Sequence, residues 1–366
     1  MHLSFSGCSE FLDCLQAERS DDPLWVLLFA DRHAESVPGV LAAARERGMR
    51  LCGGVFPGLI DGSRRVDEGC IAIPQPEGTQ LAVGSLAGAR LEWSSPLPEL
   101  ASTQSSSAMV FVDCLAAGIT GFLEVLFDTY GNRIHYAGAG TGFHDLRDAP
   151  SVFSESGFVE SGALFLLVPR QLTVSVQHGW RRIAGPFIAT RTSGNVILEF
   201  DWSAAGPFYR SQVEAQDATM CGRPLFPDIN AVYPLCIGKE GCEDVMRDPM
   251  RIGDAGEIAV LSDVTENSAM YLAHGDVASL IAAARQAVID CGQPGAVDVA
   301  FVSDCYSRAL ALGEAFGDEL AEVSDALREI TTARPEGVLA LGEVAANRRA
   351  NLEFYNKTFV VALRHE

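Results

Sequence analysis

Histidines are the residues of this chain with the clearest potential for ligand chemistry. His178 stands in the segment QHGWRRIAGPF, where a strand-like run meets a turn, with Trp180 and Phe187 close by in the sequence. A neutral imidazole beside aromatic and apolar groups is a good axial ligand for haem iron. A lone histidine before a glycine is also a common hydrogen-bonded structural residue, so the pattern alone leaves both interpretations of His178 open.

A glycine-rich run, GAGTGF at residues 138–143, follows a strand-like segment. Its spacing is GxGxG, and the HDLRDAP that follows has no helical periodicity, so it fits neither a dinucleotide-binding loop nor a P-loop. We expect a tight turn at a sheet end, where glycine supplies the positive φ. A weaker hypothesis places this turn at the rim of a ligand pocket.

Two cysteines, Cys114 and Cys305, each follow an aspartate at the end of a strand-like run. A helix N-terminus at that place could lower the pKa of a thiol, whereas burial in the core is the more common fate of a free cysteine. The chain contains no GxSxG, HExxH or CxxC. We therefore expect a binding protein rather than an enzyme, with a cysteine nucleophile kept as a rival hypothesis.

Strand-like and helical patterns alternate along the chain and must position these residues. Residues 25–30, 36–48 and 51–60 indicate strand, helix and strand, and residues 276–291 and 306–316 indicate helices in the second half. We expect an α/β fold of the mixed α+β type, with mixed sheets flanked by helices.

A short internal echo suggests two related units. FVDCLAAGITGF begins at Phe111 and FVSDCYSRALAL begins at Phe301, so each half has a strand that ends in Asp-Cys before a helix. The match predicts a possible internal pseudo-repeat. The segment 217–240 is rich in proline, glycine and cysteine and is the expected linker.

Charge and hydropathy restrict the class of protein. The 366 residues carry a formal net charge of −21, which argues against sequence-independent binding to nucleic acid, because that needs a cationic surface. The apolar stretches fall short of the roughly 20 residues that a membrane-spanning helix needs, and the N-terminus lacks a secretory pattern. We expect a cytoplasmic protein that binds neither nucleic acid nor membrane.

Several segments spread over most of the chain carry a family resemblance. In the first part they are LCGGVFPGLI from Leu51, the GAGTGF run, and HGWRRIAGPFIAT with NVILEFDWSAAGPFY between His178 and Tyr209. In the second part they are ENSAMYLAHGD, FVSDCYSRALALG, GVLALGE and EFYNKT. In this order the segments resemble the N-terminal and C-terminal parts of the FIST proteins, a two-part sensory module of prokaryotic signalling systems. The resemblance implies a FIST-N-like domain over residues 1–215 and a FIST-C-like domain over residues 216–366.

The resemblance is greatest to the stand-alone branch of the family that binds haem and senses nitric oxide. It implies one haem b with His178 as the iron ligand, Trp180, Phe187 and Phe143 as pocket walls, and His144 as a rival ligand. It also implies regulation of a partner histidine kinase in a two-component pathway, with a homodimer as a possible state. A haem-free FIST sensor of a small metabolite, such as an amino acid, is the main alternative.

Overall fold

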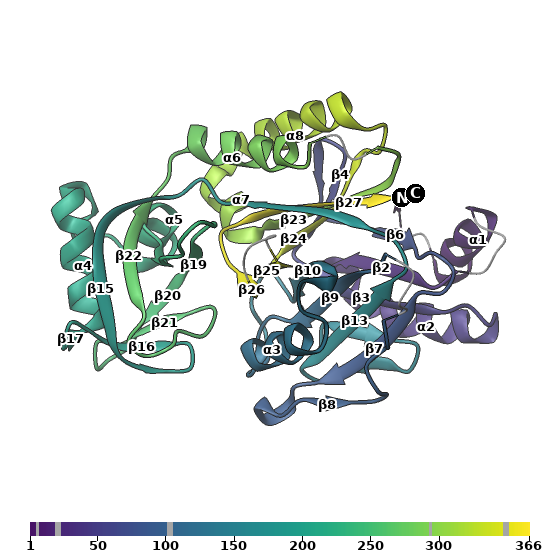
Figure 1. Ribbon diagram of the computed structural model, residues 1–366, viewed down its shortest axis with the longest axis horizontal. Helices are drawn as coiled ribbons and strands as arrows, with labels where there is room; N and C mark the ends of the chain where they lie inside the picture. Colours follow the sequence, from purple (N-terminus) through teal and green to yellow (C-terminus); the bar gives the residue numbers. More distant parts are fainter. Residues whose placement is uncertain (5–6, 19–22, 101–104, 293–294, 347–350) are drawn as a thin grey trace.

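Three sheets share one interior, and each is built around two parallel strands joined by one or two helices (Figure 1). The computed structural model describes residues 1–366 except 5–6, 19–22, 101–104, 293–294 and 347–350. The parallel pairs are β2–β3, β9–β10 and β23–β24. Each first strand also pairs antiparallel with a later strand, β6, β13 or β27. The three units therefore repeat one topology.

The helices and strands of the three units have the following bounds. Unit 1 contains β1 (His2–Leu3), α1 (Cys8–Glu18), β2 (Trp25–Ala30), α2 (Val37–Glu46), β3 (Leu51–Phe56), β4 (Gly58–Asp61), β5 (Arg64–Val66) and β6 (Cys70–Pro74). Unit 2 contains β7 (Gln80–Ser85), β8 (Glu92–Trp93), β9 (Ser107–Asp113), α3 (Ile119–Tyr130), β10 (His135–Thr141), β11 (Val152–Ser154), β12 (Gly157–Val159) and β13 (Gly162–Val168). Unit 3 contains β14 (Leu172–Gln177), α6 (Val277–Asp290), β23 (Val297–Cys305), α7 (Tyr306–Leu312), α8 (Phe316–Ile330), β24 (Pro335–Ala340), β25 (Glu343–Ala346), β26 (Leu352–Tyr355) and β27 (Phe359–His365).

Each unit gives a hairpin to the sheet of another unit. The β4–β5 hairpin of unit 1 pairs with β24 of unit 3, and the β25–β26 hairpin of unit 3 pairs with β10 of unit 2. The β11–β12 hairpin of unit 2 pairs with β3 of unit 1, which closes the cycle. We call the three interlocked units the ring. Because of this exchange, no unit has a complete sheet of its own.

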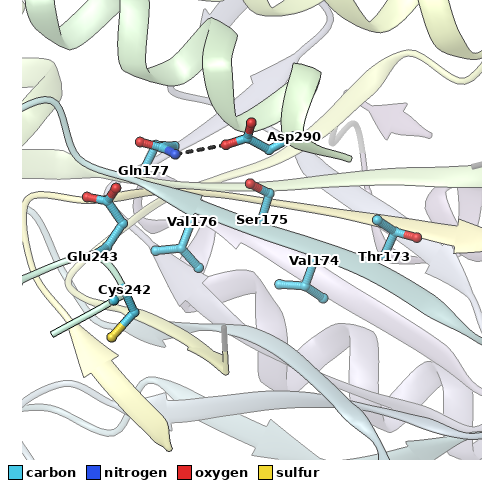
Figure 2. Close-up of a pocket in the computed structure, with 9 residues that line it drawn as sticks. Thr173, Val174, Ser175, Val176, Gln177, Cys242, Glu243 and Asp290 are labelled. Atoms are coloured by element: carbon cyan, nitrogen blue, oxygen red, sulfur yellow. Dashed lines mark hydrogen bonds between the residues drawn. The ribbon is translucent and has the colours of Figure 1, made fainter. Parts of the chain in front are cut away.

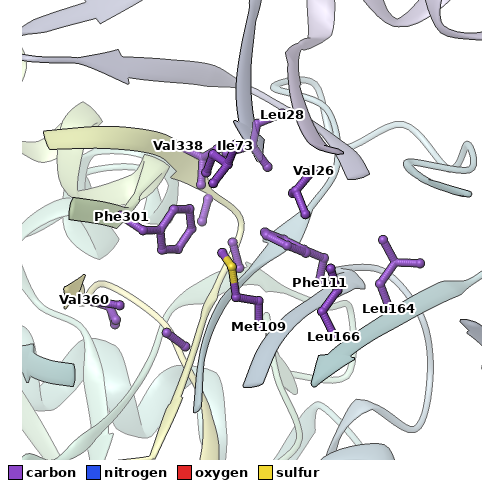
Figure 3. Packing of buried hydrophobic residues seen from close by; sticks show 14 of the residues in the cluster. Val26, Leu28, Ile73, Met109, Phe111, Leu164, Leu166, Phe301, Val338 and Val360 are labelled. Carbon is purple, nitrogen blue, oxygen red and sulfur yellow. The ribbon is translucent and has the colours of Figure 1, made fainter. Parts of the chain in front are cut away.

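Aromatic side chains from all three units meet in the shared interior. The ring centroid of Phe111 lies 6.2 Å from that of Phe56 and 6.3 Å from that of Phe301, and all three side chains are buried. Figure 3 shows Phe111 and Phe301 within the surrounding aliphatic cluster. Burial of large aromatic side chains is a main source of core stability, so this cluster holds the units together.

Glycine in the second parallel strand lets the strands of each pair approach closely. A Cβ at Gly138 would lie 1.7 Å from the backbone oxygen of Val110, and one at Gly337 would lie 1.7 Å from that of Val302. Gly53 is equally constrained by β2. The turn predicted for GAGTGF is therefore wrong for residues 138–141, which belong to β10, and Gly138 serves strand pairing instead. Gly142, just past the end of the strand, does have a positive φ, of 152°.

A lobe is inserted into unit 3 between β14 and α6 and lies at the left of Figure 1. Its single curled sheet has the order β19-β18-β22-β15-β16-β21-β20. Only Asp248 separates the two edge strands β19 and β20 in the sequence, so the sheet turns back on itself there. The lobe contains β15 (Arg181–Ser193), β16 (Val196–Phe200), β17 (Ser203–Ala204), α4 (Ala205–Gln216), α5 (Asn230–Val232), β18 (Leu235–Ile237), β19 (Val245–Arg247), β20 (Pro249–Ile252), β21 (Ile258–Val260) and β22 (Ala269–His274).

The mixed α+β fold with helices on the sheets is confirmed. Phe111 in β9 and Phe301 in β23 occupy matching strands of units 2 and 3, and unit 1 adds a third copy that the sequence echo did not indicate. The segment expected to be a linker contributes β18 to the lobe sheet. The predicted domain boundary after residue 215 stays a prediction.

Candidate functional site

A cleft of about 650 Å³ opens between the lobe and unit 2 of the ring. One wall comes from the start of α3, where Leu115, Ile119 and Leu123 present apolar side chains, and from Leu352 and Phe354 of β26. The facing wall comes from β20, β21 and the loops around them in the lobe. A concave site between two structural parts, with an apolar wall and a few polar groups, is typical of small-molecule binding.

The strand β26 and the loop after it connect the ring to the lobe. The Glu353 carboxylate pairs with Lys239 Nζ at 2.6 Å, and the Phe354 carbonyl accepts from Arg247 at 3.4 Å. Asn356 Oδ1 accepts from Ser262 Oγ at 3.0 Å. These residues belong to EFYNKT, so the motif forms one edge of the cleft and holds the lobe.

A buried polar cluster completes this connection. Lys357 Nζ donates to Ser307 Oγ at 2.8 Å and lies 3.4 Å from Asp248 Oδ2, while Ser307 Oγ donates to the same carboxylate at 2.6 Å. Asn230 Nδ2 donates to Asp248 Oδ1 at 3.1 Å. Lys357 and Ser307 belong to the ring, whereas Asp248 and Asn230 belong to the lobe. The cluster therefore fixes the lobe at the seam of its curled sheet.

Three cations of the described part of the chain line the cleft, and Arg247 differs from the other two by its burial. Only 6% of Arg247 is exposed, and burial lowers the pKa of its guanidinium to about 10. Its Nε donates to the Asp263 carbonyl at 2.9 Å and its Nη1 donates to the Met246 carbonyl at 3.0 Å. Lys239 is paired with a carboxylate, and Arg251 is exposed. The cleft therefore presents positive charge on its lobe side.

His178 lies behind a different hollow, which runs along the edge strand β14. This hollow has a volume of about 460 Å³ and is lined mainly by polar groups, including Gln177, Glu243 and Asp290 (Figure 2). His178 is buried; its Nδ1 accepts from the Trp180 amide at 2.9 Å, and its Nε2 lies 2.8 Å from Glu243 Oε2. Both ring nitrogens are therefore engaged within the protein.

The other residues predicted for the haem pocket lie in separate places. Trp180 is buried beside Lys357 and donates from Nε1 to that residue's carbonyl at 3.0 Å. Phe187 packs inside the lobe, with its ring centroid 5.0 Å from that of Phe208. Phe143 packs under α1 and α2 of unit 1. The structure thus brings His178 and Trp180 together but not the two phenylalanines.

His144 stands at the surface of the ring near unit 1. Its Nδ1 lies 2.6 Å from Asp31 Oδ2, and its side chain is 56% exposed. A carboxylate on one ring nitrogen is the arrangement that orients many metal-binding histidines. His144 lines neither of the hollows described above, however.

The residues present do not fit a haem bound through His178. Its Nε2 faces Glu243 rather than open space, and the adjoining hollow is polar, whereas haem needs apolar contact on both faces. No group of three or more histidine, cysteine, aspartate or glutamate side chains suited to a metal ion occurs in the described part of the chain. Haem b therefore stays a prediction from the family resemblance.

The two cysteines considered as nucleophiles are buried. Burial raises the pKa of the Cys114 thiol well above its usual value, and the same cause raises that of Cys305. The thiolate is the reactive form of cysteine, so neither environment favours nucleophilic attack.

The residues that form the cleft and its polar connection were mostly missed in the sequence. EFYNKT was singled out as a signature, but nothing in its letters indicated that Lys357 would be buried against a lobe residue. Arg247 carries no local motif at all. Its distinguishing property, burial without a carboxylate partner, depends on the folded packing of β19 against β26.

Two domain families match the chain. The FIST N domain matches residues 25–203, which cover most of units 1 and 2 and the start of the lobe. The FIST C domain matches residues 208–346, from α4 to β25. No curated protein matches the chain. Among the described residues, no helix is long and apolar enough to cross a membrane. With both domains present in this order, the chain belongs to the FIST family of signal-transduction sensor proteins.

Proposed function

We propose that this protein senses a small metabolite in the cleft between the lobe and the ring. The observation that carries the proposal is the cleft itself. Its walls come from the ring and the lobe, which are joined by β26 with the loop after it and by one buried polar cluster. A ligand that contacts both walls would favour the arrangement in which they lie closest together. The change in lobe position would then be read by a signalling partner.

Hydrogen exchange measured by mass spectrometry tests this proposal. The purified protein is screened with a metabolite panel for a rise in melting temperature, and each stabilising compound is taken to exchange measurements. We expect protection in residues 115–124, 259–268 and 351–354, which line the two walls. A stabilising compound that protects neither wall would contradict the proposed site.

A cleft-filling variant provides the matched control. Ala117 is exposed at the cleft, so Ala117→Trp occupies ligand space without disturbing the core. Ala42 is exposed on α2, which lies on the far side of the ring from the lobe in Figure 1 and does not line the cleft, so Ala42→Trp makes the same change elsewhere. We expect Ala117→Trp to abolish the ligand-dependent stabilisation and Ala42→Trp to keep it. Equal responses would place the ligand outside the cleft.

The family resemblance implies a more specific function, in which a bound haem senses nitric oxide and the protein controls a histidine kinase. An ultraviolet-visible spectrum of protein produced with a haem supply tests the cofactor directly. A Soret band lost in His178→Ala would support the predicted ligand and require Glu243 to move away from its imidazole. A band lost only in His144→Ala would assign the iron to the rival ligand, and no band in the wild type would favour the metabolite sensor.

A further inference from the structure

We propose that the cleft binds a small organic carboxylate, with Arg247 as the residue that anchors the carboxylate group. This inference rests on the proposed function, because it names the chemical class of the ligand in the same cleft. It is carried by the unusual environment of one buried arginine and by the distribution of charge around it.

Arg247 is the one buried arginine without an ion pair in the described part of the chain. Arg308 pairs with Asp304 and Glu319, and Arg364 pairs with Asp298 at 2.8 Å. No carboxylate oxygen lies within 4.0 Å of the Arg247 guanidinium among the ion pairs of the described residues. A buried cation without a partner is costly, because arginine keeps its charge and water no longer solvates it.

Backbone carbonyls hold this guanidinium in one orientation. The carbonyls of Asp263, Met246 and Phe354 accept from Nε and Nη1, at 2.9, 3.0 and 3.4 Å. The third nitrogen, Nη2, makes no hydrogen bond to the described residues, and Arg247 lines the cleft. A carboxylate in the cleft would supply the missing acceptor and the missing negative charge at once, which is the contact that arginine makes best.

The charges around the cleft disfavour a ligand with more than one negative charge. Lys239 and Arg251 add to Arg247, whereas Glu353 and Asp263 oppose them. Glu353 is already paired with Lys239, and Asp263 Oδ2 accepts from Thr120 Oγ1 at 3.1 Å. Glu124 is the third carboxylate on the lining, so the three cations and three anions cancel among the described residues. A bound monoanion would therefore leave the cleft and ligand together with one net negative charge, and a dianion such as phosphate would leave two, so a singly charged carboxylate is favoured over phosphate.

The rest of the ligand should be apolar. Leu115, Ile119, Leu123, Leu352 and Phe354 face the cleft from the ring side. A carboxylate with a hydrocarbon body would bury that body against these side chains while its charged end met Arg247. The chemical class is therefore a small carboxylate with an aliphatic or aromatic body.

Thermal unfolding of the whole chain tests the proposal with defined probes. The wild type is melted with sodium phenylacetate or 3-methylbutanoate, with the corresponding neutral amides, and with inorganic phosphate, all at one ionic strength set by sodium chloride. We expect a saturable rise in melting temperature with the carboxylates and none with the amides. Amides that stabilise as well as the acids, or no response to either acid, would overturn the proposal. A larger effect of phosphate would overturn the carboxylate class.

Two buried arginines give a matched pair of variants. Arg247→Met should weaken the binding of the carboxylates about tenfold or more, whereas Arg364→Met should keep the response of the wild type. Without ligand, Arg364→Met should lose more stability than Arg247→Met, because only the former leaves a carboxylate without its partner. An Arg247→Met variant that responds as the wild type does would overturn the anchor.

A second variant keeps the test decisive if Arg247→Met fails to fold. Arg247→Lys preserves the charge but loses the forked donors, so we expect folded protein with a reduced response to the carboxylates. An unchanged response in that variant would also overturn the anchor. This inference and the proposed function can fail separately. If a neutral metabolite protects both walls from hydrogen exchange, the carboxylate proposal is wrong but the proposal of a sensor stands.

Discussion

The buried pair of Lys357 and Asp248 should decide whether the lobe stays fixed to the ring. At most 3% of either side chain is exposed, and the Lys357 ammonium lies 3.4 Å from the Asp248 carboxylate. We consider the change Asp248→Asn, which keeps the size of the side chain and removes its charge. Lys357 would then be a buried cation whose nearest remaining partner is the Ser307 hydroxyl.

The magnitude follows from the distance and the burial. At 3.4 Å and an effective dielectric constant of about 20, the attraction between two unit charges is about 5 kcal/mol. Removing one partner of a buried ion pair usually costs about 3–5 kcal/mol, because the other charge stays desolvated. We therefore expect Asp248→Asn to lower the free energy of unfolding by about 3–5 kcal/mol, and to increase hydrogen exchange in the lobe first.

Chemical denaturation with a double-mutant cycle measures this effect. Lys357→Met combined with Asp248→Asn removes both charges, so the double variant should be more stable than Asp248→Asn alone by about 2 kcal/mol. Glu68→Gln is the matched control, because Glu68 lies 3.5 Å from Arg32 and both side chains are more than 60% exposed, so we expect a loss of about 1 kcal/mol or less. A loss below about 1 kcal/mol for Asp248→Asn, or strict additivity in the cycle, would refute the reasoning.

Three further predictions concern the ring. Phe111→Ala removes the aromatic side chain that meets the other two units and should cost about 3–5 kcal/mol in denaturant titrations. Burial raises the pKa of Glu343 well above its ordinary value, so the folded state keeps a proton that the unfolded state releases above the ordinary glutamate pKa. The free energy of unfolding should therefore fall as the pH rises through that window, and Glu343→Gln should remove this fall; parallel pH profiles of the two proteins would contradict it. A fragment that ends at Ala204 lacks the partners of β4 and β10, so we expect no cooperative unfolding transition by circular dichroism, whereas a sharp transition would show that units 1 and 2 fold alone.

Local patterns predicted the individual elements well. The apolar run at Trp25–Ala30 is β2, and the helix expected at residues 276–291 is α6, which begins with a capping box between Asp276 and Ser279. These features depend on neighbouring residues. The exchange of hairpins does not, because β4 pairs with a strand about 275 residues further along the chain, and no local pattern encodes such a partner.

The candidate site was harder still to predict from the sequence, because its contacts join residues that are far apart in the chain. His178 was expected beside aromatic residues, and the backbone amide of Trp180 does donate to its imidazole, but the contact of that imidazole with Glu243 comes from a distant loop. GAGTGF resembled a turn because glycine tolerates positive φ, whereas here Gly138 serves the spacing of parallel strands. Arg247 could not be found, since a missing counter-ion is a property of the surroundings rather than of the sequence.

The threefold arrangement of the ring has a consequence for how such proteins diversify. In each unit, one connection leads from the strand that opens the unit (β1, β7 or β14) to the parallel pair. This connection carries α1 in unit 1, β8 in unit 2 and the whole lobe in unit 3. Extra chain added at these three positions leaves the interlocked sheets unchanged. The same scaffold could therefore exchange one sensory attachment for another, and related proteins should differ most in length at these three connections.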